Sequence, residues 1–169
     1  MKNLNKKRAV KVALSTAVAA SAFVATSNVN EAEASSNVNE LVEGAVSAGT
    51  VLKWAISLEG SGDFKTRPYV EYNNAKKAIK LAEDAFSNLS YNKKLASQVK
   101  LLDAKTQVQR AQAYIDAITS SEKIKELNDT LDKEIASGDL ARIEKAYHSA
   151  SFEYKKQAKL LDRVYGQST

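Results

Sequence analysis

Cysteine is absent from this 169-residue chain, and proline and histidine occur only once each. Without cysteine there can be no disulfide, no zinc–thiolate site and no iron–sulfur cluster. One proline, six glycines and no convincing alternation of polar and apolar residues argue against β-structure. The chain must therefore gain its stability by burying apolar side chains between helices.

Enzyme signatures are missing as well. The sequence contains no G-x-S-x-G, no H-E-x-x-H and no phosphate-binding glycine loop. The single histidine, His148, has no second histidine nearby, whereas a metal site needs several ligands. No pair of carboxylates, Glu83-Asp84 included, is marked out for acid–base catalysis. We therefore predict a non-enzymatic protein with no catalytic residues, no metal site and no cofactor.

The first 34 residues are organised like a secretory signal peptide. A basic stretch from Lys2 to Lys11 precedes an apolar run from Val12 to Ala25, and Ala32-Glu33-Ala34 fits a cleavage site. The apolar run, at about 14 residues, is shorter than the roughly 20 that a membrane span needs. We predict a signal peptide over residues 1–34, one domain over residues 35–169 and no membrane association after cleavage.

Removal of this leader changes the charge balance. The whole chain carries +5 at pH 7, but 5 of its 25 basic residues and 2 of its 20 acidic residues lie in the leader, which leaves +2. Phosphate binding needs a concentrated basic surface, so nucleic acid is not an expected partner. Export without cysteine is typical of a Gram-positive cell surface.

The remaining chain has the pattern of successive amphipathic helices. The clearest helix is Tyr69 to Leu89, in which apolar residues recur at spacings of three and four and Pro68 occupies the first turn. Another helix is expected from about Ser36 to Leu58, followed by a loop at Gly60 to Asp63. The predicted fold class is all-α, an antiparallel bundle of long helices with short loops.

A third helix is expected from about Tyr91. Its apolar stripe starts with Leu95, Val99 and Leu102 and shifts register near Leu101, as happens when a long helix changes partners. A capping-box pattern at Thr119 to Glu122 leaves a break and one continuous helix as alternatives.

The last part of the chain begins with a strong stop signal. In Ser137-Gly138-Asp139, glycine suits the left-handed position after a helix and aspartate suits the next N-cap. We expect a short helix that is interrupted near Ser149 to Ser151. A final segment from Phe152 to Val164 should turn Tyr154 inward and its lysines outward.

Lysine and tyrosine residues gather on two of these helices. Sugar rings stack on aromatic faces and acidic groups pair with Lys or Arg, so such surfaces suit an acidic polysaccharide. A plainer interpretation stays open, because lysine runs are usually solvated faces and inward tyrosines usually belong to the core. The candidate polymer-binding residues are Arg67, Tyr69, Tyr72, Lys76, Lys77, Lys80, Lys155, Lys156, Lys159, Arg163 and Tyr165.

Several sequence blocks together resemble the start of SbsC-type S-layer proteins of bacilli. They are the leader KKRAVKVALSTAVAASAFVATSN, VEYNNAKKA at residues 70–78, AYIDA at 113–117, SGDLARIEKAYH at 137–148 and LLDRVYGQST at 160–169. Each block is short, but their order and spacing agree over nearly the whole chain. Members of this family continue for hundreds of residues into β-rich lattice-forming domains, so a fragment, a truncated gene and a free-standing module are all open for this chain.

The resemblance implies an all-helical N-terminal domain that attaches the S-layer to the cell. Its partner would be a secondary cell-wall polymer, an acidic glycan on peptidoglycan, with other S-layer subunits as further partners. The positions that match family motifs are Tyr72, Lys76, Lys77, Arg163 and Tyr165, whereas the other candidates depend on the patch argument alone.

Two other functions compete with polymer anchoring. A secreted, adhesin-like protein-interaction module would expose a large apolar patch and bind its partner at high salt. A wall hydrolase would need a cleft with convergent carboxylates. The polymer-binding hypothesis instead predicts multivalent binding that salt weakens, because salt screens exposed charges.

Overall fold

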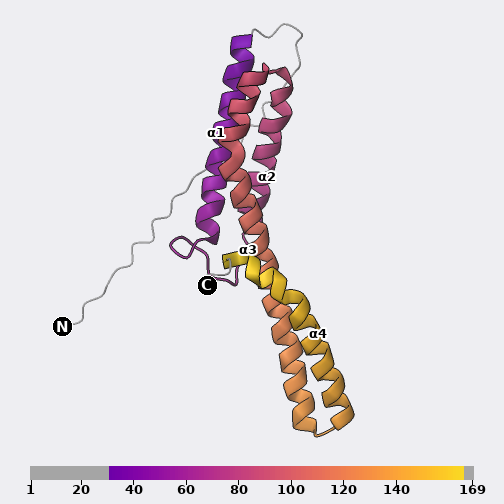
Figure 1. Ribbon diagram of the computed structural model, residues 1–169. Coiled ribbons are helices and arrows are strands. Elements are labelled where there is room, and N and C mark those ends of the chain that lie inside the picture. Colours follow the sequence, from indigo (N-terminus) through magenta and orange to yellow (C-terminus); the bar gives the residue numbers. More distant parts are fainter. Residues whose placement is uncertain (1–30, 166–169) are drawn as a thin grey trace, which may run out of the picture.

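The computed structural model describes residues 31–165 and consists of helices and short loops (Figure 1). Residues 1–30 of the leader predicted over residues 1–34 lie outside the described residues, as do residues 166–169. Among the described residues there is no β-strand, which confirms the all-α prediction. The elements are α1 (Glu31–Ile56), α2 (Tyr69–Asp84), the 3-10 helix η1 (Ala85–Asn88), α3 (Tyr91–Ser137) and α4 (Leu140–Tyr165).

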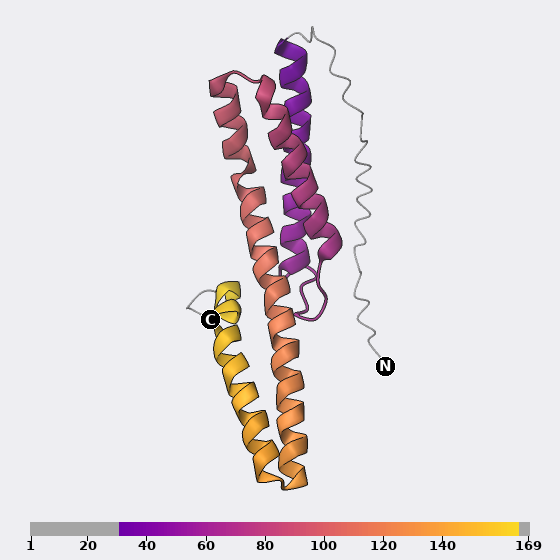
Figure 2. The ribbon, with the colours of Figure 1, turned by 90° about the vertical axis from the view of Figure 1, so that its right-hand side faces the viewer.

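The helices form two joined parts with α3 as the shared element. The first half of α3 packs with α1 and α2 as a three-helix bundle, and the second half continues beyond it and pairs with α4 as an antiparallel hairpin (Figures 1 and 2). The result is elongated, because α3 runs through both parts over 47 residues. The simple bundle that we predicted therefore describes only the first part.

The core of the three-helix bundle consists of small and branched apolar side chains. Its members are Val38, Val42, Ala45, Leu52, Ala75, Ile79, Ala82, Phe86, Leu101, Ala104 and Ala111. Successive core positions are three, four or seven residues apart along each segment, as an amphipathic stripe requires. Gly49 lies at the closest approach of α1 to α3, where a β-carbon would stand 2.8 Å from the Cα of Ala104.

Several boundaries differ from the sequence predictions. Helix α1 begins at Glu31 and ends at Ile56, slightly before Leu58. Helix α3 passes through Thr119–Glu122 without a break, because the Thr119 hydroxyl donates to the Ile115 carbonyl inside the helix and caps no new one. The expected interruption at Ser149–Ser151 was also wrong, since the Ser149 hydroxyl bonds the Lys145 carbonyl and α4 is continuous.

The turn between α3 and α4 follows the sequence prediction closely. Gly138 has a φ of 74°, the left-handed conformation expected after a helix. The Asp139 carboxylate accepts hydrogen bonds from the backbone N–H groups of Ala141 and Arg142 at 3.1 and 3.2 Å. The turn and cap together fold α4 back along α3.

The inward and outward sides of α3 and α4 were partly mispredicted. Leu95, Val99 and Leu102 do not start the core stripe of α3, because each is at least half exposed. On α4 the expected inward Tyr154 is 59% exposed, whereas Glu153 and Gln157 are buried against α3. Polar side chains therefore occupy the centre of the hairpin interface.

Candidate functional site

The loop before α2 fixes where that helix starts. The Asp63 carboxylate accepts hydrogen bonds from the backbone N–H groups of Lys65 and Thr66 at 2.9 and 2.7 Å, and these bonds lower its pKa from 3.8 to about 2. Phe64 adopts a φ of 56°, and its N–H donates to the buried Tyr114 hydroxyl at 2.7 Å. The loop is thereby attached to α3, and α2 begins at a defined position beside it.

Arg67, a predicted polymer-binding residue, makes contacts within the protein. Its guanidinium donates to both carboxylate oxygens of Glu122, and its Nε donates to the Thr119 hydroxyl at 3.3 Å. The hydrogen bond from Arg67 lowers the pKa of Glu122 and raises that of Arg67. Since the Arg67 side chain is 22% exposed, it mainly joins the start of α2 to the middle of α3.

Tyr72 stands at the edge of the bundle with one face toward solvent. Its hydroxyl donates to Oε1 of Gln112 at 2.5 Å, and the Gln112 amide donates to Asp116 at 2.8 Å. The Lys76 ammonium lies 5.1 Å from the centroid of the Tyr72 ring, within the range of a cation–π contact. Gln112 and Asp116 were not predicted, although polar residues four apart on one face of a helix were a detectable signal.

The outer side of α2 carries a row that we call the α2 cationic face, defined as Tyr69, Asn73, Lys76 and Lys80. These residues are four, three and four positions apart, so they share one side of the helix. All four are exposed, and Tyr69 is 51% exposed. Neither lysine of this face forms an ion pair with a carboxylate of the described residues.

The remaining lysine of α2, Lys77, is exposed but turned further around the helix axis, at about 100° per residue from Lys76. Near the end of α2 the next charged residue on this side is an acidic one, Glu83, which forms an ion pair with Lys105 of α3 at 2.5 Å. The α2 cationic face extends about 16 Å along the helix axis from Tyr69 to Lys80, at 1.5 Å per residue.

The second predicted cluster lies on α4. Lys155, Lys156 and Lys159 are exposed on the side away from α3, as the sequence predicted. Lys156 lies 3.6 Å from the carboxylate of Glu153. The side chains of Arg163 and Tyr165 lie outside the described residues.

A buried polar network links α4 to α3 beneath this cluster. The Ser120 hydroxyl donates to Oε1 of Gln157 at 2.7 Å, and the Gln157 amide donates to Glu153. Glu153 also binds the ammonium of Lys123 at 3.0 Å, and these contacts, the Gln157 bond above all, lower the pKa of Glu153. This network was not predicted, because the spacing of apolar residues on α4 predicted Tyr154 and Ala158 as inward residues instead.

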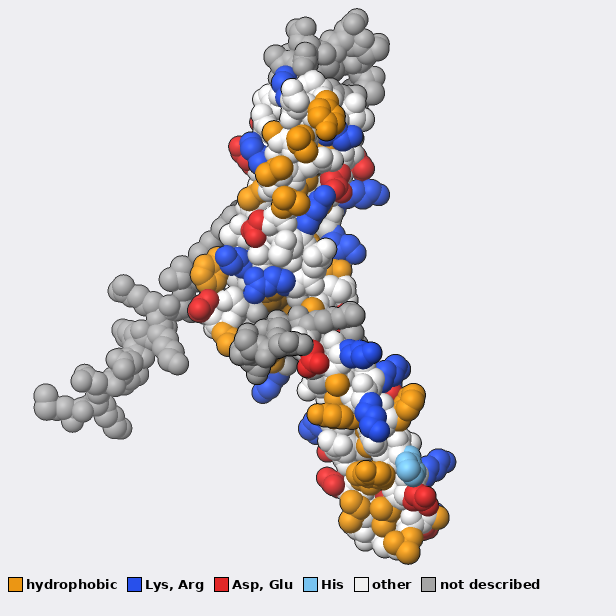
Figure 3. Space-filling model, in the orientation of Figure 1, with side chains coloured by type: hydrophobic (Ala, Val, Ile, Leu, Met, Phe, Trp, Pro, Cys, Tyr) orange, Lys and Arg blue, Asp and Glu red, His pale blue; other side chains and the backbone are white. Residues whose placement is uncertain are grey.

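The two predicted clusters are not brought together into one site. Helix α2 packs on one side of the first half of α3, and α4 packs on the opposite side of its second half (Figure 2). Lysine and arginine side chains are spread along the length of the molecule on the face in Figure 3, without one dominant patch. The described candidate lysines therefore form two separate cationic surfaces.

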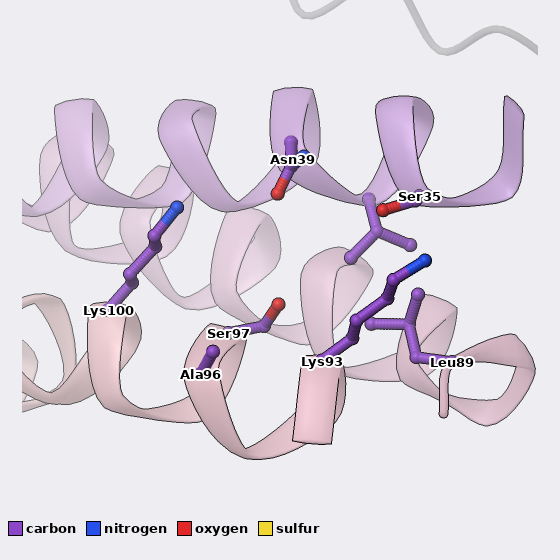
Figure 4. Close-up of a pocket in the computed structure, with 8 residues that line it drawn as sticks. Ser35, Asn39, Leu89, Lys93, Ala96, Ser97 and Lys100 are labelled. Carbon is purple, nitrogen blue, oxygen red and sulfur yellow. The ribbon is translucent and has the colours of Figure 1, made fainter. Parts of the chain in front are cut away.

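A shallow groove of about 190 Å³ at the other end of the bundle was not predicted (Figure 4). It lies between the first turns of α1 and α3 and is lined by Ser35, Val38, Asn39, Leu89, Lys93, Ala96, Ser97 and Lys100. Figure 4 shows Asn39 and Ser97 pointing toward each other across the groove. Lys93 and Lys100 lie on α3, one on each side of Ser97 along the helix. Lys93 and Lys100 are seven residues apart, a spacing that places them on one side of a helix.

Within residues 31–165 no group of three acidic or histidine side chains is arranged to hold a metal ion. No helix among those residues is long and apolar enough to cross a lipid bilayer.

Comparison with known proteins gives two matches that agree with each other. Residues 53–169 match a protein-family model described as the SbsC C-terminal domain, whereas the sequence resemblance implied an N-terminal domain. An S-layer protein of Geobacillus stearothermophilus is 32% identical over 181 residues, which cover 98% of this chain and 15% of the relative. No solved structure matches the chain.

Proposed function

Because this chain belongs to the SbsC family of S-layer proteins, we propose that it is a non-enzymatic anchoring module that binds an acidic secondary cell-wall polymer. Membership of the family makes it a cell-surface, S-layer-type protein. The chain spans 15% of the length of its S-layer relative, so polymer binding and lattice formation are proposals for this part.

The α2 cationic face is the surface that best supports the proposal. It presents two exposed ammonium groups and the exposed ring of Tyr69, and the half-buried ring of Tyr72 lies beside it. Lys76 lies over the Tyr72 ring, so a sugar could stack beside a positive charge that pairs with its carboxylate or pyruvyl group. The adjacent arrangement of Lys76 and Tyr72 is the single observation on which the proposal depends most.

The structure also suggests different roles for the predicted residues. Tyr69, Tyr72, Lys76 and Lys80 would bind the polymer, and Lys77 would add charge beside them. Arg67 would support the face by fixing the start of α2 to α3. Lys155, Lys156 and Lys159, with Arg163 and Tyr165, would form a second contact, so a long polymer would bind with higher avidity than a short one.

Retention on purified Gram-positive wall sacculi tests the proposal. Sacculi from which hydrofluoric acid has removed the accessory polymer serve as the matched control. We expect retention on untreated sacculi, loss of retention on stripped sacculi, and progressive release as salt screens the exposed charges. Equal retention on both kinds of sacculi would contradict the proposal.

An adhesin-like protein-interaction module is the second candidate function. The observation in its favour is a run of exposed apolar side chains on α3, among them Tyr91 and Leu95. Binding to stripped sacculi or to a protein partner that persists at high salt would favour this candidate. The absence of released sugar after incubation with sacculi would exclude a wall hydrolase.

A further inference from the structure

Four exposed apolar residues of α3 form a continuous line on one side of the helix. Their exposed fractions are 78% for Tyr91, 50% for Leu95 and 59% for both Val99 and Leu102. They are four, four and three residues apart, so they lie along one face over about 16 Å. We call this set the α3 stripe, and Figure 3 shows hydrophobic side chains gathered on the upper part of the molecule.

The α3 stripe continues the surface on which α4 packs. Ser120, which bonds Gln157 of α4, follows Leu102 by 18 residues, or five whole turns at 3.6 residues per turn. Ala111, which packs against Leu52 and Ala75, precedes Ser120 by two and a half turns and so faces the opposite way. Helix α3 thus has one apolar face for α1 and α2 and a second face, of which α4 covers the lower part, with polar residues at its centre, and the α3 stripe forms the apolar upper part.

Within residues 31–165, no helix covers the α3 stripe. In this antiparallel pair Gln157 lies beside Ser120, so Tyr165, the last described residue of α4, is level with about Gln112. The stripe begins ten residues earlier on α3, at Leu102, and extends to the first residue of the helix. Among the described residues the α3 stripe is therefore exposed along its length, and it lies end to end with the surface that α4 covers.

We propose that the α3 stripe docks against the same stripe of a second copy of this chain, with the two α3 helices antiparallel about a two-fold axis. The stripe is self-complementary in that orientation. Tyr91 of one copy is level with Leu102 of the other, and Leu95 is level with Val99, so each apolar side chain meets an apolar partner. An isologous contact of this kind closes on itself as a dimer.

The residues beside the stripe suit this partner. Gln98 lies next to the two-fold axis, where its amide can bond the Gln98 amide of the second copy. On the other edge Asn92 is level with Asp103 of the second copy; Oδ1 of Asp103 already accepts from the Gln107 amide at 3.0 Å, which leaves its second oxygen for the Asn92 amide. Lys105, a lysine at the Gln98 edge, is already bound to Glu83.

The antiparallel arrangement also leaves room for both α4 helices. Helix α4 contacts α3 only from about Gln112 onward. In the proposed dimer, Gln112 of the second copy would lie past the start of α3 in the first copy, by a distance equal to about nine helical residues. The described part of each α4 therefore lies outside the paired segment. The surface is small for a protein–protein interface, so we expect a weak dimer that the wider S-layer context would strengthen.

Cysteine crosslinking tests the dimer directly, because the natural chain contains no cysteine. Under mild oxidation, a Gln98→Cys variant should form a disulfide-linked dimer at least about tenfold faster than Asn128→Cys, since docking raises the effective thiol concentration. Asn128 is a matched control, exposed on α3 but outside the stripe. A mixture of Tyr91→Cys and Leu102→Cys should link as the heterodimer faster than either variant links alone.

A second substitution shows whether the crosslink at position 98 forms in the docked dimer or by random collision of two chains. Leu95→Lys added to the Gln98→Cys variant should reduce the crosslinking rate at least about tenfold, because docking would bury two unpaired charges. Circular dichroism should show unchanged helix content, since Leu95 is outside the core. Equal crosslinking at positions 98 and 128, or crosslinking that survives Leu95→Lys, would overturn the proposal, whatever the sacculus experiment shows.

Discussion

Gly49 of α1 lies so close to Ala104 of α3 that a β-carbon at position 49 would stand 2.8 Å from both the Cα and the Cβ of Ala104. Real β-carbons do not approach other carbon atoms this closely, so a side chain at position 49 would force α1 or α3 to move. The contact therefore sets the distance between α1 and α3, on which the packing of Val42, Ala45 and Leu101 depends.

We expect Gly49→Ala to destabilise the protein even though alanine favours helix formation. The steric cost of overpacking is about 1–3 kcal/mol, and the gain in helix propensity returns up to about 1 kcal/mol. Gly44→Ala is the matched control on the same helix, because nothing lies within 4 Å of a β-carbon there. Chemical denaturation should show a lower free energy of unfolding for Gly49→Ala and an equal or higher one for Gly44→Ala.

The sequence predicted the helices well but not the two faces of α3. The stripe of Leu95, Val99 and Leu102 and the stripe containing Leu101 are both apolar, and periodicity cannot tell which of them meets a partner. The structure separates them, because α1 and α2 cover only the second stripe along the first half of the helix. A long helix with two apolar faces was thus misinterpreted as one stripe with a shift of register.

The candidate site was also only partly predictable from the sequence. The exposure of the lysines on α2 and α4 followed from their spacing, but their placement on opposite sides of α3 depends on contacts between helices. The network of Ser120, Glu153 and Gln157 was not predicted, because a buried carboxylate is acceptable only when specific partners surround it. Of the partners of Glu153, Gln157 is four residues away in the sequence, but Lys123 is thirty residues away, and Ser120 is 37 residues from Gln157.

Arg67 provides a test of which predicted residues bind polymer. Arg67→Ala removes the contacts to Glu122 and Thr119, so we expect the melting temperature to fall by a few degrees. Retention on sacculi below that temperature should be nearly unchanged. Loss of retention with an unchanged melting temperature would assign Arg67 to the polymer instead.

Lys76 and Lys80 should contribute directly to polymer binding. We expect the double variant Lys76→Ala/Lys80→Ala to weaken retention about threefold to tenfold at moderate salt, since each exposed ion pair contributes modestly. Lys133→Ala/Lys145→Ala, at the far end of the hairpin, removes the same charge and serves as the control. Equal loss in both double variants would show that only net charge matters and would contradict a specific α2 site.

The hairpin of α3 and α4 should lose stability in acid because of Glu153. Its hydrogen bond from Gln157 and its contact with Lys123 hold its pKa below the ordinary value of 4.5 in the folded protein. A carboxylate with a lowered folded pKa contributes stability that is fully present above the unfolded pKa and disappears as pH falls through the folded pKa. The Glu153 contribution should therefore be intact at pH 7 and decline below about pH 4.5.

Glu153→Gln isolates this effect from the acid sensitivity of Asp63 and Glu122, whose pKa values are also lowered. We expect the variant to be less stable than the natural chain at pH 7, because Lys123 loses its partner, and the difference to shrink toward pH 3. Denaturation midpoints measured across this range, with the exposed Glu126→Gln as control, provide the measurement. A difference that stays constant as the pH falls would show that the Glu153 charge does not stabilise the α3–α4 interface.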